Sequence, residues 1–153
     1  MEYTLRKYKA SDYDFVYDVK KICYQKYVEE YFGGWDDNVQ RQMFDDLMKQ
    51  DAKHTYIINV ENKPVGFFSD GEDTPEGYHP NNLCLLPECR GKGIGSDILN
   101  NVFAKHKNQN IYLKVFKSNP AQNLYKRLGF EVYDETKSHY LMVRMKEEIL
   151  SKD

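Results

Sequence analysis

The stretch "LCLLPECRGKGIGSDILNNVFAKH", Leu83–His106, decides how this chain folds. An apolar run typical of a β-strand precedes three glycines in five residues, and apolar residues at helical spacing follow them. Such a turn from strand to helix exposes main-chain N–H groups, and the positive end of the helix dipole reinforces them. The loop therefore predicts a site for a phosphate or pyrophosphate group.

The spacing of the glycines excludes two common phosphate-binding motifs. The dinucleotide pattern GxGxxG requires a glycine three residues after Gly93, where this chain has Ser96. The pattern GxxxxGK[ST] does not occur in the chain. Taken without its neighbours, the loop is explained equally well as a glycine-rich turn that binds nothing.

Composition narrows the class of protein. A chain of 153 residues with 41% hydrophobic and 30% charged residues is typical of one soluble globular domain, which we expect to span residues 1–153. A net charge of −2 provides no basic field for a polyanion, which argues against nucleic-acid binding. The sequence shows no signal peptide and no apolar run long enough to cross a membrane. Three cysteines make no disulfide framework and favour a reducing cytoplasm, and the four histidines lack metal-ligand spacing, so we expect no metal.

Apolar periodicity and turn residues predict the order β-α-α-β-β-β-α-β-α-β-β, an α/β fold with a mixed sheet and helices on both faces. The acidic residues 70–77 are expected to form a loop, followed by one strand to about Leu86. In the first helix, Phe15, Val19 and Ile22 are expected to face the core. Asp36 or Asp37 is expected to cap the second helix.

Two separated motifs give the chain a family resemblance. "LCLLPECRGKGIG" followed by "VFKSNPAQNLYKRLGFEVYDE" resembles the GNAT superfamily of acetyl-CoA-dependent N-acetyltransferases, and the likeness covers the whole element order. The resemblance implies that the pyrophosphate of coenzyme A is held by main-chain N–H groups, and that the pantetheine arm pairs with the main chain of Cys84 and Leu85. The expected pyrophosphate-binding residues are Arg90, Gly91, Lys92, Gly93, Ile94, Gly95 and Ser96.

The resemblance also implies a mechanism. Members of the superfamily generally transfer the acetyl group by direct attack, so Cys23 and Cys89 are interpreted as buried or surface thiols rather than nucleophiles. Tyr125 aligns with the tyrosine that protonates the leaving thiolate, a transfer that a phenol of pKa ~10 can make to a thiolate whose acid has a pKa of ~8.5. By pattern alone, Tyr125 is also explained as a core residue of its helix. Asn119 is expected both to cap that helix and to contact the cofactor.

The general base is not evident from the sequence. Many relatives carry an acid just before the strand, where this chain has Asn81 and Asn82. His79, His139 or a water chain ending on an acid of residues 70–76 are the alternatives. The missing acid keeps a second hypothesis open, namely a GNAT-fold protein that senses acyl-CoA without turnover.

The acceptor side is predicted from the first two helices. Tyrosines recur along one face of the first helix, which indicates either packing against the next helix or an acceptor groove. "EEYFGGWDDNVQ" and "SHYLM" resemble a branch of the superfamily with acceptor-side residues at these positions. The expected acceptor-binding residues are Glu30, Tyr31, Trp35, Asp36, Gln40, Asn82 and His139. The acceptor is a small-molecule or peptide amine that the sequence does not identify, and a homodimer is left open.

Overall fold

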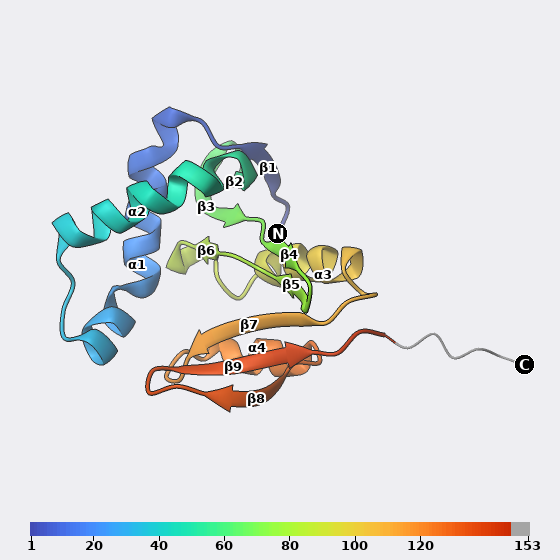
Figure 1. The fold of residues 1–153 in the computed structure, drawn as a ribbon. Helices are drawn as coiled ribbons and strands as arrows, with labels where there is room; N and C mark the ends of the chain where they lie inside the picture. The colour runs from blue at the N-terminus through green and yellow to red at the C-terminus, as the bar shows by residue number, and fades with distance from the viewer. Residues whose placement is uncertain (148–153) are drawn as a thin grey trace, which may run out of the picture. The chain divides into compact units, whose positions relative to one another are not determined.

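The computed structural model of the protein describes residues 1–147, which form two compact units (Figure 1). Unit 1 comprises Met1–Gly71 with Asn81–Gly95, and unit 2 comprises Glu72–Pro80 with the chain from Ser96 onward. Each unit contains its own β-sheet. No helix among residues 1–147 is long and apolar enough to cross a membrane.

Unit 1 combines an antiparallel sheet with the first two helices. Its strands stand in the order β1-β2-β3-β6, which makes β6 an edge strand of this sheet. The β2–β3 hairpin turns at Glu61 and Asn62, both at positive φ (51° and 65°), as a tight two-residue turn requires. The elements are β1 (Thr4–Lys7), α1 (Tyr13–Phe32), α2 (Asp37–Asp51), β2 (Thr55–Val60), β3 (Lys63–Ser69) and β6 (Leu83–Leu85), with short 3-10 turns η1 (Ala10–Asp12), η2 (Ala52–His54) and η3 (Pro87–Cys89).

Helix α1 packs against β3 and β6, but its buried face differs from the predicted one. Val16 and Val19 are buried, as is Tyr27, whereas Ile22 is 51% exposed. Val19 is thus confirmed as a core residue and Phe15 packs against the core, whereas Cys23 takes the place predicted for Ile22. The prediction for Ile22 was wrong because tyrosine side chains, which were assigned to a separate face, fill part of the core instead.

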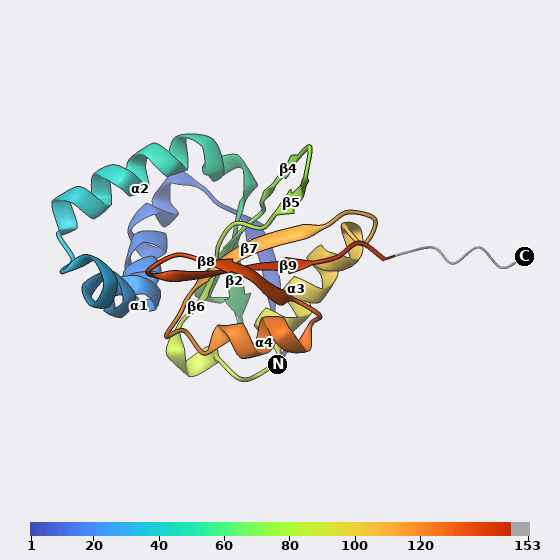
Figure 2. The same ribbon diagram turned by 60° about the horizontal axis from the view of Figure 1, so that its bottom comes forward.

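Unit 2 holds a five-stranded sheet in the order β4-β5-β7-β9-β8, with one parallel pair, β5–β7. Phe103 of α3 and Tyr125 of α4 both contact the ring of Phe130, so the two helices share one core with the start of β8; Figure 2 shows α4 running along the sheet. The elements are β4 (Glu72–Thr74), β5 (Gly77–His79), α3 (Ile94–Lys105), β7 (Ile111–Phe116), α4 (Ala121–Arg127), β8 (Glu131–Glu135) and β9 (His139–Arg144). The first two residues of α3 belong to unit 1.

The predicted mixed α/β class is confirmed, with two corrections. The acidic segment expected to be a loop forms the β4–β5 hairpin, with Glu72 opposite His79. The single strand expected to end near Leu86 is divided, because β5 pairs with β7 whereas β6 pairs with β3. The chain thus forms two sheets where one was predicted, and it leaves one sheet and enters the other at Pro80–Asn82.

Candidate active site

The glycine loop joins β6 to α3 in unit 1. After η3, Gly91 and Gly93 take left-handed φ values of 72° and 89°, and α3 begins at Ile94. A β-carbon added at either glycine would meet nothing within 4 Å, so their outer sides are open. The first N–H groups of a helix have no partner within it, and those of α3 follow directly on this open loop. The loop thus has the form that anion binding requires.

Arg90 opens the loop, and its side chain is fixed on β6 and α1. Its Nε donates to the Leu85 carbonyl at 3.0 Å, and its Nη2 lies 3.3 Å from Cys23 Sγ. Lys92 is exposed, and its carbonyl accepts from the amino group of Met1 at 3.4 Å. Two basic residues therefore flank the open glycines.

The register of β6 determines which main-chain groups of that strand point away from β3. Leu86 N donates to Val65 O and Ser69 N donates to Asn82 O, each at 2.8 Å. Hydrogen-bonded and non-bonded pairs alternate in an antiparallel ladder, so Cys84 bonds to its opposite residue Phe67. Leu83 and Leu85 direct their N–H and C=O groups to the other edge. Leu85, rather than Cys84, has the outward main-chain groups.

The two asparagines before β6 each hold a group from another element. Asn81 Nδ2 donates to Asp51 Oδ2 at 2.9 Å, at the end of α2. Asn82 Oδ1 accepts from the Tyr24 hydroxyl at 3.3 Å. A carboxylate therefore lies at the upstream end of this strand, although the local sequence has none. Sequence reasoning missed Asp51 because it is 30 residues from Asn81.

The predicted acceptor residues of unit 1 lie at the end of α1 and the start of α2. Asp36 caps α2, since its carboxylate accepts from Asn38 N and Val39 N, as predicted. Trp35 Nε1 donates to Asp37 Oδ1 at 2.9 Å, and the Trp35 ring packs on the core of unit 1.

The Asp37 carboxylate accepts hydrogen bonds from several side chains, which the sequence did not indicate. Besides Trp35, it accepts from the Tyr17 hydroxyl at 2.9 Å and from Lys21 at 3.1 Å. Hydrogen bonds from Trp35, Lys21 and Tyr17 lower the pKa of Asp37 to about 2. Of the other predicted acceptor residues on these two helices, Glu30 is exposed whereas Tyr31 and Gln40 are partly buried.

The remaining predicted residues belong to unit 2. Asn119 Oδ1 accepts from Ala121 N at 2.9 Å, which confirms its capping role at α4. The Tyr125 ring is partly buried and meets Phe130 edge-on at 5.9 Å between centroids. Gly129 ends α4 at a φ of 97°, as its position in the sequence indicates.

Two histidines of unit 2 have environments suited to accepting a proton. His139 lies 2.7 Å from Ser138 Oγ, and burial together with Lys114 lowers the pKa of His139, so its ring is neutral near pH 7. His79 Nε2 lies 2.9 Å from Glu76 Oε1, and its ring stacks on Tyr112. Among residues 1–147, no group of three His, Cys, Asp or Glu side chains is arranged to hold a metal.

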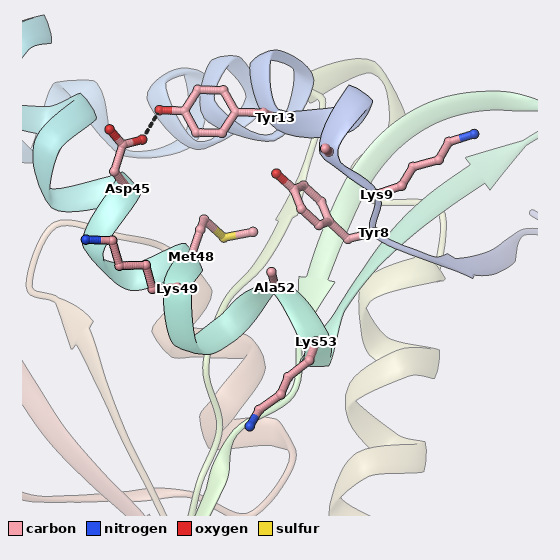
Figure 3. A pocket seen from close by; sticks show the side chains of 9 residues that line it. Tyr8, Lys9, Tyr13, Asp45, Met48, Lys49, Ala52 and Lys53 are labelled. Atoms are coloured by element: carbon pink, nitrogen blue, oxygen red, sulfur yellow. Dashed lines mark hydrogen bonds between the residues drawn. The ribbon is translucent and has the colours of Figure 1, made fainter.

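An open hollow of about 550 Å³ lies elsewhere in unit 1, between the start of α1 and the end of α2 (Figure 3). Tyr13 donates to Asp45 at its rim, a hydrogen bond that raises the pKa of Tyr13. In Figure 3 the ammonium groups of the surrounding lysines point away from the hollow. Its lining contains no predicted site residue and consists of Tyr8, Lys9, Ala10, Tyr13, Asp45, Met48, Lys49, Ala52 and Lys53.

Comparison with known proteins gives a consistent picture. The acetyltransferase (GNAT) domain family matches residues 51–132, more than half of the chain. An uncharacterised N-acetyltransferase of Methanocaldococcus jannaschii is 29% identical over 93% of this chain, which spans 66% of that relative's length.

Solved structures share the fold. A Pyrococcus horikoshii crystal structure superposes with a TM-score of 0.75 at 21% identity, covering 96% of this chain and 100% of the other. The PaiA N-acetyltransferase of Thermoplasma acidophilum, solved with coenzyme A, superposes with a TM-score of 0.67 at 18% identity, covering 95% of this chain and 99% of the other. At these identities the likeness establishes the arrangement of elements.

Proposed function

Because the chain belongs to the GNAT acetyltransferase family, we propose that it transfers an acetyl group from acetyl-CoA to a primary amine, and that residues 1–153 act as one such domain. The matched domain confirms the family predicted from the two motifs. The observation that carries the proposal is the loop, in which two open, left-handed glycines lead directly into α3.

The glycine loop and β6 fit coenzyme A in two respects. Main-chain N–H groups from Arg90 to Ser96, with Lys92 beside them, would hold its pyrophosphate, because helix N-termini and glycine nests favour anions. The outward N–H and C=O groups of Leu85 would pair with the amide-bearing pantetheine arm, whereas the main chain of Cys84, also named from the resemblance, pairs with Phe67 of β3.

When bound, acetyl-CoA supplies a thioester whose carbonyl is open to attack by an amine. In our proposal a main-chain N–H near Leu85 donates to that carbonyl oxygen and stabilises the developing negative charge. The Tyr125 hydroxyl gives its proton to the departing sulfur, and Asn119 fixes the start of the helix that carries Tyr125. Attack is direct, without an acyl-enzyme on a protein side chain.

The base would be one of the two histidines of unit 2. His139 is neutral near pH 7 because burial and Lys114 lower its pKa, which is what proton acceptance requires. The sequence offered His79 and an acid of residues 70–76 as separate alternatives for the base. His79 combines the two, since its partner Glu76 belongs to that acidic segment. A glutamine at each position in turn separates them, because replacing the base removes the acidic limb of the pH–rate profile.

The acceptor is a small-molecule or peptide amine that we propose to be bound by Glu30, Tyr31, Trp35, Asp36, Gln40, Asn82 and His139. The structure favours the aromatic and amide groups of this set over Asp36, because that carboxylate is already used in capping α2. Exposed Glu30 remains the acid best suited to attract a cationic amine.

The experiment is a thiol-release assay with acetyl-CoA and a panel of polyamines, amino acids and peptides. We expect Tyr125→Phe to lower kcat by about ten- to a hundredfold with little change in acetyl-CoA affinity, because only proton delivery is lost. Tyr112→Phe, in the same unit, is the matched control and keeps its turnover. Unchanged kcat in Tyr125→Phe would remove Tyr125 from the mechanism, and tight acetyl-CoA binding without thiol release across the panel would favour the sensor hypothesis.

A further inference from the structure

Two thiols and a guanidinium meet inside unit 1. Cys23 lies on the core-facing stripe of α1, and Cys84 lies in β6, against which α1 packs. Both thiols are free; Cys23 is partly buried, whereas Cys84 is 1% exposed. Cys23 Sγ lies 3.6 Å from the carbonyl oxygen of Leu85, the residue after Cys84, and Cys23 packs against the buried cluster that contains Cys84, so the two thiols lie close together.

The charges around the pair make the two thiols unequal. Cys23 Sγ lies 3.3 Å from Arg90 Nη2 and 3.6 Å from the Leu85 carbonyl, while Lys20 and Tyr24 of α1 face Cys84. The Cys84 hydrogen bond and the Arg90 charge lower the pKa of Cys23 to about 7, against the opposing effect of burial. Burial and the neighbouring Cys23 raise the pKa of Cys84. Cys23 is the better nucleophile of the two, because the thiolate is the reactive form and a nearby arginine stabilises it.

We propose that Cys23 and Cys84 form a thiol–disulfide exchange site that takes low-molecular-mass disulfides such as glutathione disulfide. The Cys23 thiolate attacks one sulfur of the small disulfide, and the S–S bond breaks as a small thiolate leaves and is protonated by solvent. Cys84 then attacks the Cys23 sulfur, the mixed S–S bond breaks, and the second small thiolate leaves with the proton of Cys84. Two protein thiols become one disulfide, and one small disulfide becomes two thiols.

The order of the two steps follows from the geometry. Cys23 reacts first because it is partly exposed and lies beside Arg90, whereas the buried Cys84 cannot meet a molecule from solvent. The closeness of the two thiols compensates for the weak acidity of Cys84, because a neighbouring group acts at a high effective concentration. The product removes the thiol partner of Arg90, the first residue of the glycine loop. The proposal stands independently of the acetyl transfer.

The experiment exposes the whole chain to glutathione disulfide at neutral pH, followed by acid quenching, alkylation and peptide mass mapping. We expect a Cys23–Cys84 disulfide while Cys89 is alkylated. Cys84→Ser stops at a stable mixed disulfide of Cys23 with glutathione, and Cys23→Ser forms neither product. Cys89→Ser is the matched control and reacts as the unchanged chain does.

Arg90→Gln tests the electrostatic step with both thiols retained. Its first exchange should slow by about two- to fivefold at neutral pH. A rise of one to two units from a pKa of about 7 lowers the thiolate fraction about five- to fiftyfold, and the gain in nucleophilicity offsets about half of this on a logarithmic scale. Three results would overturn the proposal: modification of Cys89 as fast as that of Cys23, a mixed disulfide on Cys23 that persists in the unchanged chain, or an inert Cys23 when the urea-unfolded chain reacts.

Discussion

Replacing Gly66 with alanine should strain the pairing of β6 with β3. A β-carbon at this position would lie 2.2 Å from the Cys84 carbonyl oxygen, 0.8 Å inside the 3.0 Å that such contacts almost never pass. It would also meet the Leu85 main chain at 3.1 Å, so neither obstacle is a side chain that can rotate away. The strands must separate, or the alanine must stay overpacked.

The magnitude follows from the cheaper of these two outcomes. Overpacking costs about 1–3 kcal/mol. Separation loses the Leu86–Val65 and Ser69–Asn82 hydrogen bonds and those of the Cys84 pair between them, about 1 kcal/mol each and so about 4 kcal/mol together. Overpacking is the cheaper outcome, so we expect Gly66→Ala to lower the free energy of unfolding by about 1–3 kcal/mol.

Urea denaturation measures this loss, and the KM for acetyl-CoA should rise at least about tenfold because the outward groups of Leu85 move with β6. Gly34→Ala is the matched control, since an added β-carbon there meets nothing within 4 Å. A Gly66→Ala variant as stable as Gly34→Ala would refute the close approach of β3 and β6.

Two further substitutions test single features of unit 1. Asp12 accepts two hydrogen bonds from Arg6 at 2.8 Å, which lower the pKa of Asp12, so its contribution to stability is complete above the ordinary carboxyl pKa and is lost as pH falls through the lowered value. Asp12→Asn should lower the free energy of unfolding by about 2 kcal/mol at neutral pH in urea denaturation. A difference in this free energy between variant and unchanged chain that does not narrow on acidification would contradict the prediction. Gly93→Ala should lower the free energy of unfolding by about 1–2 kcal/mol because alanine is strained at positive φ, whereas Gly95→Ala should be tolerated because its β-carbon makes ordinary contacts at 3.7 Å or more. Thermal unfolding compares the two variants, and equal melting temperatures would show that the loop does not need a left-handed residue at position 93.

The features that the sequence predicted well are local ones. The glycine loop and the cap by Asp36 each depend on residues within a few positions of one another. Their conformations follow from the steric limits of the backbone and from side chains that hydrogen-bond to nearby main-chain groups. Both depend on residues that are close together in the sequence. The capping role of Asn119 was predictable for the same reason.

The β4–β5 hairpin could not be predicted because distant partners stabilise it. Its strands are three residues long, and the acidic β4 has no apolar alternation. Tyr78 is 1% exposed, stacks on His106 and donates its N–H to Asn110 O at 2.9 Å. Both partners lie in the segment that follows α3, so pairing and burial outweigh the low strand propensity of the acidic residues.

The upstream end of β6 shows why a missing acid in a motif is weak evidence against catalysis. Asn81 and Asn82 replace the expected carboxylate in the sequence, yet Asn81 hydrogen-bonds Asp51 from the end of α2 at 2.9 Å. An amide can donate to a carboxylate, which an acid at the same position would repel. The substitution that removes a carboxylate from the strand therefore permits another one to approach it. In the same way Cys23 approaches Arg90 across 67 residues of chain. A contact between two elements cannot be seen in a sequence motif that covers only one of them. The missing acid is therefore a property of the motif and not of the whole site.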